Sequence, residues 1–262
     1  MKQYIADAFT KTLFGGNPAA VVPCRKMPLP EQMQAIAIEN NYSETAFVVK
    51  TARPGEYQLK WFTPGCEVDL CGHATLSTAF VLHQYVDPGV REMHFQTRSG
   101  ELIVRVSEEG YTLDFPAGKL ETIPLSDRIL AATNGLAREA WIGGDNTIVL
   151  LPSEDELSQL KPDFDAIMQL DSEGLIMTAP SDRYDFVSRC FFPKQSIPED
   201  PVTGSAHTWL TPLWAEKLAK QSMTAKQVSR RGGILKVSLN GDRVLITGNA
   251  VLFMAGEIPF DL

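Results

Sequence analysis

The feature that most constrains the fold of this 262-residue chain is an internal repeat. Residues 61–76 read WFTPGCEVDLCGHATL, and residues 191–206 read FFPKQSIPEDPVTGSA. Both blocks contain F-x-P, then Glu, four residues, Gly, one residue and Ala, so that Gly72 recurs as Gly204 at an offset of 132 residues. Self-similarity at a fixed offset is the sequence signature of a duplicated structural unit.

Four further pairs of segments keep nearly the same offset, between 128 and 132 residues. They are 15–22 with 143–150, 43–44 with 172–173, 98–100 with 230–232, and 111–115 with 243–247. Because the offsets centre on half the chain length, duplication explains them better than the alternative, chance reuse of glycine-rich and strand-like segments. We therefore predict two similar halves, residues 1–116 and 117–262, with the last strand a candidate to pack on the first half.

Each half has the pattern of strands packed around or against an apolar helix. Segments rich in β-branched and aromatic residues predict strands at 46–49, 59–62, 103–106 and 111–115. Pro30 opens a helical segment, EQMQAIAIEN, whose apolar residues Met33 and Ile36 share one face. Cys71-Gly72-His73 is predicted to open a second apolar helix, ATLSTAFVLHQY, and the analogous helix after Gly204-Ser205 is AHTWLTPLWAEKL. Each helix N-terminus is thus predicted at the repeated Gly. The predicted fold class is α/β, of the α+β kind.

The two repeated glycines predict where a ligand binds. A duplicated protein tends to place its site in the cleft between its halves. At Gly72 and Gly204, free backbone N–H groups and the positive end of the helix dipole would bind an anion such as a carboxylate, and glycine lets the ligand approach closely. The alternative is that these glycines only shape the starts of the helices.

Four polar residues near these helix starts are candidates for chemistry. Glu44 stands at the end of the first predicted helix, directly before a strand, where partial desolvation would suit acid–base catalysis; alternatively it is a surface residue. His73 lies at a helix start, where the dipole would favour the neutral imidazole, and a lone His is often structural. Asp200 before Pro201, and Ser205, could simply cap a turn or a helix.

The overall charge sets aside two classes of partner. The formal net charge is −8, and an acidic surface repels phosphate backbones and anionic lipid, so we expect neither nucleic acid nor a membrane as partner. The chain begins without a secretion-signal pattern and has no apolar run of about 18 residues. Its four cysteines form no C-x-x-C pair, which favours a reducing, cytoplasmic location.

The sequence also lacks the motifs of common cofactor sites. It contains no P-loop, no G-x-S-x-G elbow, and no G-x-G-x-x-G after the first strand. Its four histidines have no metal-ligand spacing with one another or with a cysteine pair. We therefore expect no cofactor and no metal, which leaves proton transfer by side chains as the chemistry.

Five blocks in order, FGGNPAAVV, SETAFV, WFTPGCEVDLCGHATL, EDPVTGSAH and SRRGGILKV, are similar to the signature blocks of the PhzF-like proteins of phenazine biosynthesis. That family belongs to the diaminopimelate epimerase superfamily. The resemblance covers nearly the whole chain. It implies two pseudo-symmetric halves, each a barrel-like sheet around a central helix, a cofactor-independent isomerase activity and a homodimer.

The resemblance also implies residue roles. In the phenazine enzyme a glutamate moves a proton on trans-2,3-dihydro-3-hydroxyanthranilate, and Glu44 corresponds to that glutamate. His73 and Asp200 correspond to orienting and charge-tuning partners, and Ser205 to part of the carboxylate site. The residues that the resemblance assigns to substrate binding are Asn17, Gly72, Gly204, Gly232 and Gly233. The implied ligand is a small molecule with a carboxylate.

One departure from the wider superfamily bears on the mechanism. Its amino-acid epimerases use two facing cysteines, and the repeat puts Cys71 and Thr203 at those positions. A threonine hydroxyl is far too weak an acid to replace a thiol, so racemisation by two bases is disfavoured. Two alternatives stay open: an amino- or hydroxy-acid epimerase or racemase that uses Cys71 and Glu44, and a non-catalytic binding or regulatory protein that retains the fold.

Overall fold

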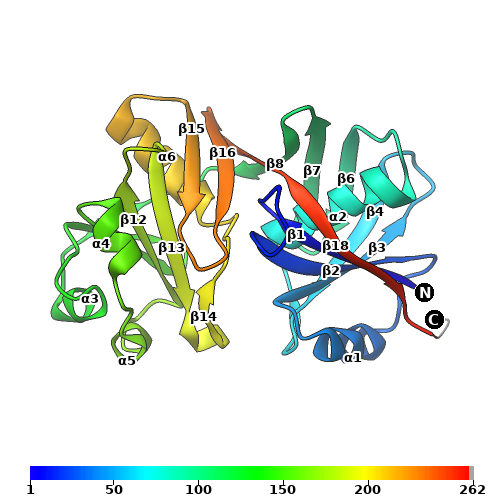
Figure 1. Ribbon diagram of the computed structural model, residues 1–262, viewed down its shortest axis with the longest axis horizontal. Helices are drawn as coiled ribbons and strands as arrows, with labels where there is room; N and C mark the ends of the chain where they lie inside the picture. Colours follow the sequence, from blue (N-terminus) through cyan, green and yellow to red (C-terminus); the bar gives the residue numbers. More distant parts are fainter. Residues whose placement is uncertain (260–262) are drawn as a thin grey trace. The chain divides into compact units, whose positions relative to one another are not determined.

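The computed structural model describes residues 1–259 and divides the chain into two compact units (Figure 1). Unit 1 comprises Met1–Phe115 together with the segment from Ile246 onward, and unit 2 comprises Pro116–Leu245. The chain therefore leaves unit 1 in strand β8 (Gly110–Pro116) and returns to it in β17 (Arg243–Gly248). Each unit is described in turn.

Unit 1 is a sheet with a helix buried along its whole length. Its strands are β1 (Lys2–Ala8), β2 (Asn17–Cys24), β3 (Glu44–Lys50), β4 (Glu56–Phe62), β5 (Glu67–Val68), β6 (Glu92–Thr97), β7 (Gly100–Ser107), β8 and β18 (Ala250–Glu257). Its helices are α1 (Pro30–Asn40), α2 (Gly72–Val81) and a π-helical turn, η1 (Leu82–Val86). All ten residues of α2 are buried, which makes it the central helix of the unit.

The sheet of unit 1 contains both antiparallel and parallel pairs of strands. β18 and β2 both pair antiparallel with β1, and β2 runs parallel to β3. β3 pairs antiparallel with β4, β4 parallel with β6, and β6, β7 and β8 follow as antiparallel neighbours. The helices α1 and α2 provide the crossovers that the two parallel pairs require.

The helix predicted from Pro30 is confirmed, and its end positions Glu44. Pro30 occupies the first turn of α1, and Met33 and Ile36 are buried against the sheet. The helix stops at Asn40 because Asn41 adopts a left-handed conformation with φ of 51°. Glu44 is therefore the first residue of β3, not the last residue of the helix as the sequence analysis had it.

Unit 2 contains a second sheet and its own buried helix. Its strands are β9 (Glu121–Ile123), β10 (Glu139–Gly143), β11 (Asn146–Leu150), β12 (Gly174–Pro180), β13 (Phe186–Phe192), β14 (Ile197–Asp200), β15 (Ser222–Gln227), β16 (Gly233–Asn240) and the start of β17. Its helices are α3 (Asp127–Ala132), α4 (Glu154–Gln159), α5 (Phe164–Met168), a short 3₁₀ turn (Pro193–Gln195) and α6 (His207–Leu218).

The pairing in unit 2 reproduces that of unit 1 strand by strand. β9 and β11 both pair antiparallel with β10, as β18 and β2 do with β1. β11 runs parallel to β12, β12 antiparallel to β13, β13 parallel to β15, and β15 antiparallel to β16. The same order of parallel and antiparallel neighbours in both units is the structural counterpart of the sequence repeat.

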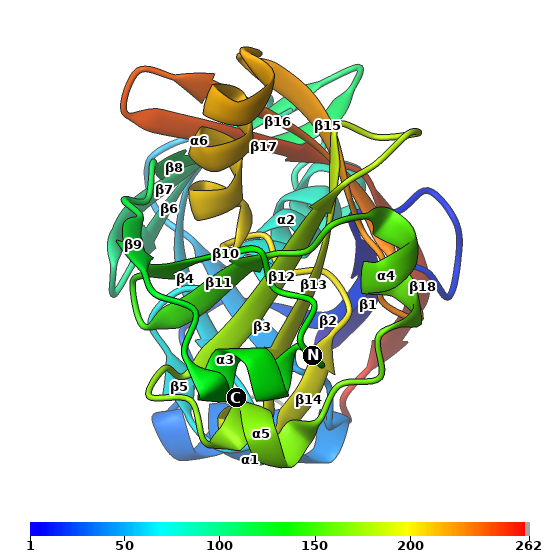
Figure 2. The same ribbon diagram turned by 90° about the vertical axis from the view of Figure 1, so that its left-hand side faces the viewer.

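Helices cover both faces of the unit 2 sheet (Figure 2). Met177 of β12 belongs to a hydrophobic core that includes Ile129 of α3 and Ile167 of α5. The next residue, Thr178, accepts a 2.9 Å hydrogen bond from the indole N–H of Trp214 in α6. Because neighbouring side chains of a strand point to opposite faces, α6 lies on the face away from α3 and α5.

The helix predicted after Gly204-Ser205 as AHTWLTPLWAEKL begins at His207, one residue after Ala206. Residues 204–206 form a turn, in which the N–H of His207 donates to the carbonyl of Gly204 at 3.0 Å. Such i→i+3 bonds tighten the chain before the first α-helical bond, which joins Leu210 to Ala206. A helix N-terminus at the repeated Gly is confirmed for Gly72, the first residue of α2, whereas Gly204 lies in the turn that leads into α6. Across residues 1–259, no helix is long and apolar enough to cross a membrane.

Candidate active site

Unit 1 contains a buried carboxylate–imidazole pair, Glu44 and His73. Glu44 begins β3, and His73 is the second residue of the central helix α2. The Oε2 atom of Glu44 lies 2.9 Å from Nε2 of His73, and their side chains are only 12% and 7% exposed. The contact is that of an ion pair rather than an aligned hydrogen bond, and neither atom has a hydrogen-bond partner within the described chain. The two side chains are therefore in contact, while their facing atoms still lack a hydrogen bond.

The other ring nitrogen of His73 faces an amide and a thiol. Asn17 places its side-chain amide 3.2 Å from Nδ1, and Cys71 places its sulfur 3.6 Å from the same atom. Asn17 is fully buried at the start of β2, immediately after Gly16, whose φ is 64°. A Cβ atom at Gly16 would overlap the carbonyl oxygen of Ala8, so glycine is required where the chain delivers Asn17 to the histidine.

The surroundings of His73 favour its charged form. Burial lowers the pKa of His73, but the neighbouring Cys71 and Glu44 together raise it by more, so the pKa lies well above the usual value. The pKa of the Cys71 thiol is itself raised, first by burial and second by the Glu44 charge. Burial and the Glu44 charge thus oppose ionisation of the thiol. The sequence analysis expected a neutral imidazole from the helix dipole, and the nearby carboxylate reverses that expectation.

Glu44, Cys71 and His73 also offer three atoms of the kind that bind metals. Their ligand atoms lie within 4.8 Å of one another. However, Cys71 faces Nδ1 and Glu44 faces Nε2, so the two lie against opposite nitrogens of one ring. One ion cannot bond to both ligands and to a single imidazole nitrogen without rearranging the site. The geometry fits proton transfer better than metal binding.

In unit 2, Asp200 and Thr203 form the second buried polar cluster. The hydroxyl of Thr203 donates to Oδ2 of Asp200 at 2.5 Å, and both residues are buried. Gln227, at the end of β15, is fully buried and bonds to this loop. Its Oε1 accepts a hydrogen bond from the Thr203 N–H at 2.8 Å. Its Nε2 donates to the Asp200 carbonyl at 2.7 Å and to the Thr203 hydroxyl at 3.1 Å.

Two further buried residues complete this cluster. Cys190 lies 3.7 Å from Oε1 of Gln227, and burial strongly raises the pKa of its thiol. His207 donates from Nδ1 to the carbonyl of Thr203 at 2.9 Å. Burial lowers the pKa of His207 to about 4, so the imidazole is neutral near pH 7. Its hydrogen bond fixes the position of the Thr203 carbonyl. Thr203 is thus held through its N–H, its carbonyl and its hydroxyl.

The remaining predicted site residues of unit 2 lie near this loop. Ser205 follows in the turn before α6, is partly exposed, and its hydroxyl has no partner among residues 1–259. Gly232 has a φ of 65°, and its N–H donates to the Ser229 hydroxyl at 3.0 Å. Gly233 is the register partner of Gln227 in the β15–β16 pair. Fold and sequence neighbourhood together bring these residues beside the Asp200–Thr203 cluster.

Sequence reasoning missed Gln227, Cys190 and His207. A signal for Gln227 existed, because the buried positions of β15 alternate as Met223, Ala225 and Gln227, which puts an amide where the pattern asks for an apolar residue. The other two carry no local signal, because their roles depend on partners more than ten residues away or on a backbone turn.

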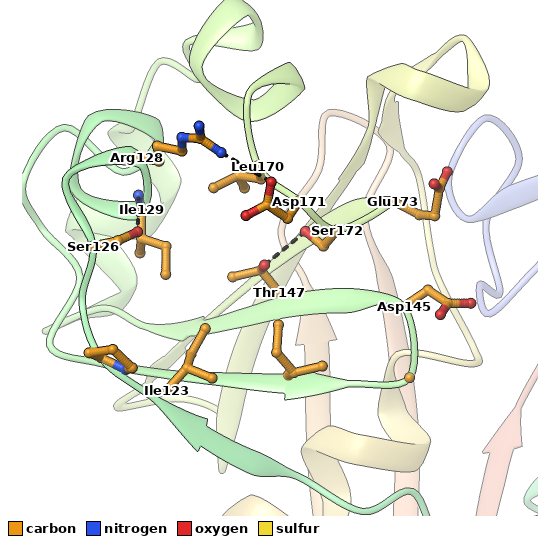
Figure 3. A pocket seen from close by; sticks show the side chains of 13 residues that line it. Ile123, Ser126, Arg128, Ile129, Asp145, Thr147, Leu170, Asp171, Ser172 and Glu173 are labelled. Carbon is orange, nitrogen blue, oxygen red and sulfur yellow. Dashed lines mark hydrogen bonds and ion pairs between the residues drawn. The ribbon is translucent and has the colours of Figure 1, made fainter.

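Unit 2 also contains a cavity of about 690 Å³ (Figure 3). Its apolar wall includes Ile123 and Ile142, and none of the predicted site residues lines it. Two pairs of its polar side chains bond each other: Arg128 bonds Asp171 at 3.0 Å, and the Thr147 and Ser172 hydroxyls lie 2.8 Å apart. Because it contains none of the predicted site residues, this cavity is not the candidate site.

Comparisons with known proteins agree with the sequence blocks. The family model of phenazine biosynthesis-like proteins, PhzC-PhzF, matches residues 6–256. The chain belongs to this family. An uncharacterized isomerase of Pseudomonas aeruginosa is 47% identical over 252 residues, 96% of each chain. The human phenazine biosynthesis-like domain-containing protein is 38% identical over 281 residues, covering 97% of this chain and 98% of its own.

Solved structures confirm the predicted fold. A PhzF-family protein of Enterococcus faecalis superposes with a TM-score of 0.95 at 47% identity over 99% of both chains. A probable proline racemase of Agrobacterium radiobacter gives a TM-score of 0.63 at 10% identity, over 99% of this chain and 93% of the other, which shows a shared fold alone. The PhzC-PhzF chain thus has the epimerase-like fold, and the prediction of a PhzF-like isomerase is confirmed at the level of the family.

Proposed function

We propose that this protein is a cofactor-independent isomerase that moves a proton on a small carboxylate-bearing substrate, with Glu44 as the acid–base group. The observation that carries the proposal is the buried contact of Glu44 with His73 at 2.9 Å, in which neither atom has a hydrogen-bond partner within the described chain. Such a pair can hold one proton on either group, as a proton shuttle requires. Relatives named as isomerases support the same reaction class.

The proposed reaction conserves electrons. Glu44 takes a proton from one carbon of the substrate, and the electron pair of the broken C–H bond moves into the conjugated system of the substrate. The proton then returns from Glu44 to another carbon, where a new C–H bond forms. Substrate and product are isomers, so the step itself requires no oxidant or reductant.

His73 keeps Glu44 ready for the first transfer. Its raised pKa favours the charged imidazole, which lies against the Glu44 carboxylate at 2.9 Å. Asn17 and Cys71 contact the far nitrogen of the ring and hold its orientation. When Glu44 accepts a proton, the pair loses its opposite charges, which favours the return of the proton.

Unit 2 supplies positioning in this proposal. The Asp200 carboxylate is fixed by Thr203, whose backbone is held in turn by Gln227 and His207. Ser205 offers a hydroxyl without a partner in the described chain, which suits a substrate carboxylate. Trans-2,3-dihydro-3-hydroxyanthranilate, the substrate that the family resemblance implies, is the first compound to test.

No observation favours the epimerase alternative. It needs Cys71 as a thiolate base, and the raised pKa of this buried thiol opposes its ionisation near neutral pH. The thiol also faces Nδ1 of His73, the nitrogen away from Glu44.

The experiment that tests the proposal follows solvent deuterium into trans-2,3-dihydro-3-hydroxyanthranilate by NMR. Glu44→Gln keeps size and polarity but cannot accept a proton, so its turnover is expected to fall by about 10⁴-fold, the upper end for one acid–base group. The affinity of the variant for the substrate should stay within about threefold, because Ser205 and the backbone rather than Glu44 are proposed to hold the carboxylate.

Glu39→Gln is the matched control, because Glu39 is an exposed glutamate of α1 in the same unit. It should turn over at the wild-type rate. Normal turnover by Glu44→Gln would show that the glutamate is structural. Joint loss of binding and turnover would place Glu44 in the carboxylate site and pass the acid–base role to His73. Failure of the wild type to exchange this compound would refute the assigned substrate.

A further inference from the structure

A second cavity, of about 830 Å³, lies in unit 1 and shares no residue with the Glu44–His73 site. It is formed where β1 begins, β2 ends and the π-helical turn η1 projects a side chain. Its size falls in the range of small-molecule sites.

Three cationic side chains meet at this cavity: Lys2 of β1, and Arg25 and Lys26 just after β2. Only one carboxylate, that of Glu257, lines it as well. None of the four makes an ion pair with any of residues 1–259. In a chain of net charge −8, unpaired lysine and arginine side chains at one cavity make a local positive potential.

An aromatic wall stands beside these cations. Tyr85 comes from η1, the π-helical turn that follows α2. Such turns are rare in proteins, but those that occur often lie at functional sites. Its ring stacks on that of Tyr4, with centroids 5.5 Å apart and planes 23° apart. Tyr85 is 45% exposed, so part of this large ring remains open to a ligand.

The hydroxyl of Tyr4 is the most specific feature of the lining. Tyr4 lines the cavity and is 6% exposed, and its hydroxyl makes no hydrogen bond within the part of the chain described. The hydroxyl oxygen itself is not fully buried, so solvent can serve as its partner. A ligand atom that accepts a hydrogen bond would take the place of that solvent.

We propose that this cavity binds a small aromatic anion, with its phosphate or carboxylate among Lys2, Arg25 and Lys26 and its ring against Tyr85. The oxygen atoms of the anion accept hydrogen bonds from the cations and from the Tyr4 hydroxyl. Stacking on a tyrosine and pairing with arginine and lysine explain why both features occur in one cavity. The site is separate from the proposed reaction and does not depend on it.

The test is isothermal titration of the wild-type protein with phenyl phosphate, benzoate, inorganic phosphate and phenol. Phenyl phosphate or benzoate should bind at least about tenfold more tightly than inorganic phosphate or phenol. Only the first two combine an anionic group for the cations with a ring for Tyr85. Amide chemical shifts of Tyr85 and Lys26 should move on binding. Equal affinity for phosphate and phenyl phosphate would refute the aromatic part.

Charge reversal separates the site from non-specific attraction. The double variant Arg25→Glu/Lys26→Glu should weaken phenyl phosphate binding by at least about tenfold. Lys119→Glu/Lys161→Glu is the matched control, because it removes two exposed, unpaired lysines of unit 2 and changes the net charge equally. It should change the affinity by less than about twofold. Equal losses in the two double variants, or no binding of any probe, would overturn the proposal.

Tyr85→Ala and a shortened chain complete the design. Tyr85→Ala should reduce the affinity for phenyl phosphate to that for inorganic phosphate. The sequence continues beyond Pro259 with Phe260 and Asp261, which themselves combine a ring with a carboxylate. The titration is therefore repeated on a chain that ends at Pro259. Binding by the shortened chain alone would refute an external ligand, whereas similar affinity in both chains supports it.

Discussion

Units 1 and 2 have the same strand order and each contains a buried polar cluster before its central helix, but the two clusters differ in how fully they are bonded. In unit 1, the facing atoms of Glu44 and His73 have no hydrogen-bond partner in the described chain. In unit 2, Thr203 is bonded through its N–H, carbonyl and hydroxyl. A group that must exchange a proton has to keep an open position, whereas a group that only positions others is best saturated.

The repeat partners of the unit 1 residues sharpen this contrast. Glu173, which aligns with Glu44, is exposed at the rim of the unit 2 cavity (Figure 3). Ser205 aligns with His73, so unit 2 lacks the imidazole as well. Duplication of the fold has therefore not duplicated the Glu44–His73 pair. In the proposed mechanism proton transfer belongs to unit 1 and positioning to unit 2, and the following variants test that division.

After Glu44→Gln, the largest effect is expected from His73→Phe in unit 1. It removes the positive partner of Glu44 while filling the same buried volume. Turnover should fall by about 10³-fold, or about 4 kcal/mol of barrier. The KM for the substrate should stay within about threefold of wild type, because His73 is proposed to act on Glu44 rather than on the substrate carboxylate. Turnover at the wild-type rate would reduce His73 to a structural residue.

The next largest effect is expected on the stability of unit 2. Gln227→Leu leaves the Thr203 N–H and the Asp200 carbonyl without their buried partner. The free energy of unfolding in urea should fall by about 3 kcal/mol, since each unsatisfied buried group costs about 1–3 kcal/mol. Gln58→Leu, at an exposed position of β4, is the control and should change stability by less than about 0.5 kcal/mol. Equal losses of stability in Gln227→Leu and Gln58→Leu would show that the Gln227 amide has no special role.

A somewhat smaller effect is expected from the pH dependence that His207 confers. Its pKa is lowered to about 4 by burial, so below its ordinary value of 6.5 the unfolded chain binds a proton that the folded chain does not. Stability is therefore lost as the pH falls from 6.5 towards 4. Between pH 7 and 4.5 this loss amounts to about 2.5 kcal/mol. His207→Phe should reduce the measured difference in unfolding free energy by that amount, and an unchanged difference would contradict a neutral buried imidazole.

The smallest effect is expected for the thiol of unit 1. Cys71→Ser keeps a small polar group near Nδ1 of His73, and burial and the Glu44 charge oppose ionisation of the thiol it replaces. Turnover should stay within about tenfold of wild type, or about 1.4 kcal/mol. A loss of several orders of magnitude would support the epimerase alternative, in which Cys71 is a base.

Much of the fold could be predicted because its signals are local or repeated. Pro30 and the spacing of Met33 and Ile36 predicted α1, and the β-branched runs predicted β3, β4, β7 and β8. The turn at residues 204–206 before α6 could not be predicted. An α-helical turn and a 3₁₀ turn at Gly204 differ only in which carbonyl accepts the hydrogen bond, and no residue type specifies that choice.

The sequence by itself determined the family, the duplicated architecture and the identity of the polar candidates, because motifs and periodicity are written in residue order. The tertiary structure alone decided which candidates meet and in what state. The Glu44–His73 contact spans 29 residues, and the hold of Gln227 on Thr203 spans 24. Protonation follows the same division, because the burial and neighbouring charges that raise the pKa of His73 and lower that of His207 arise only when distant segments pack together.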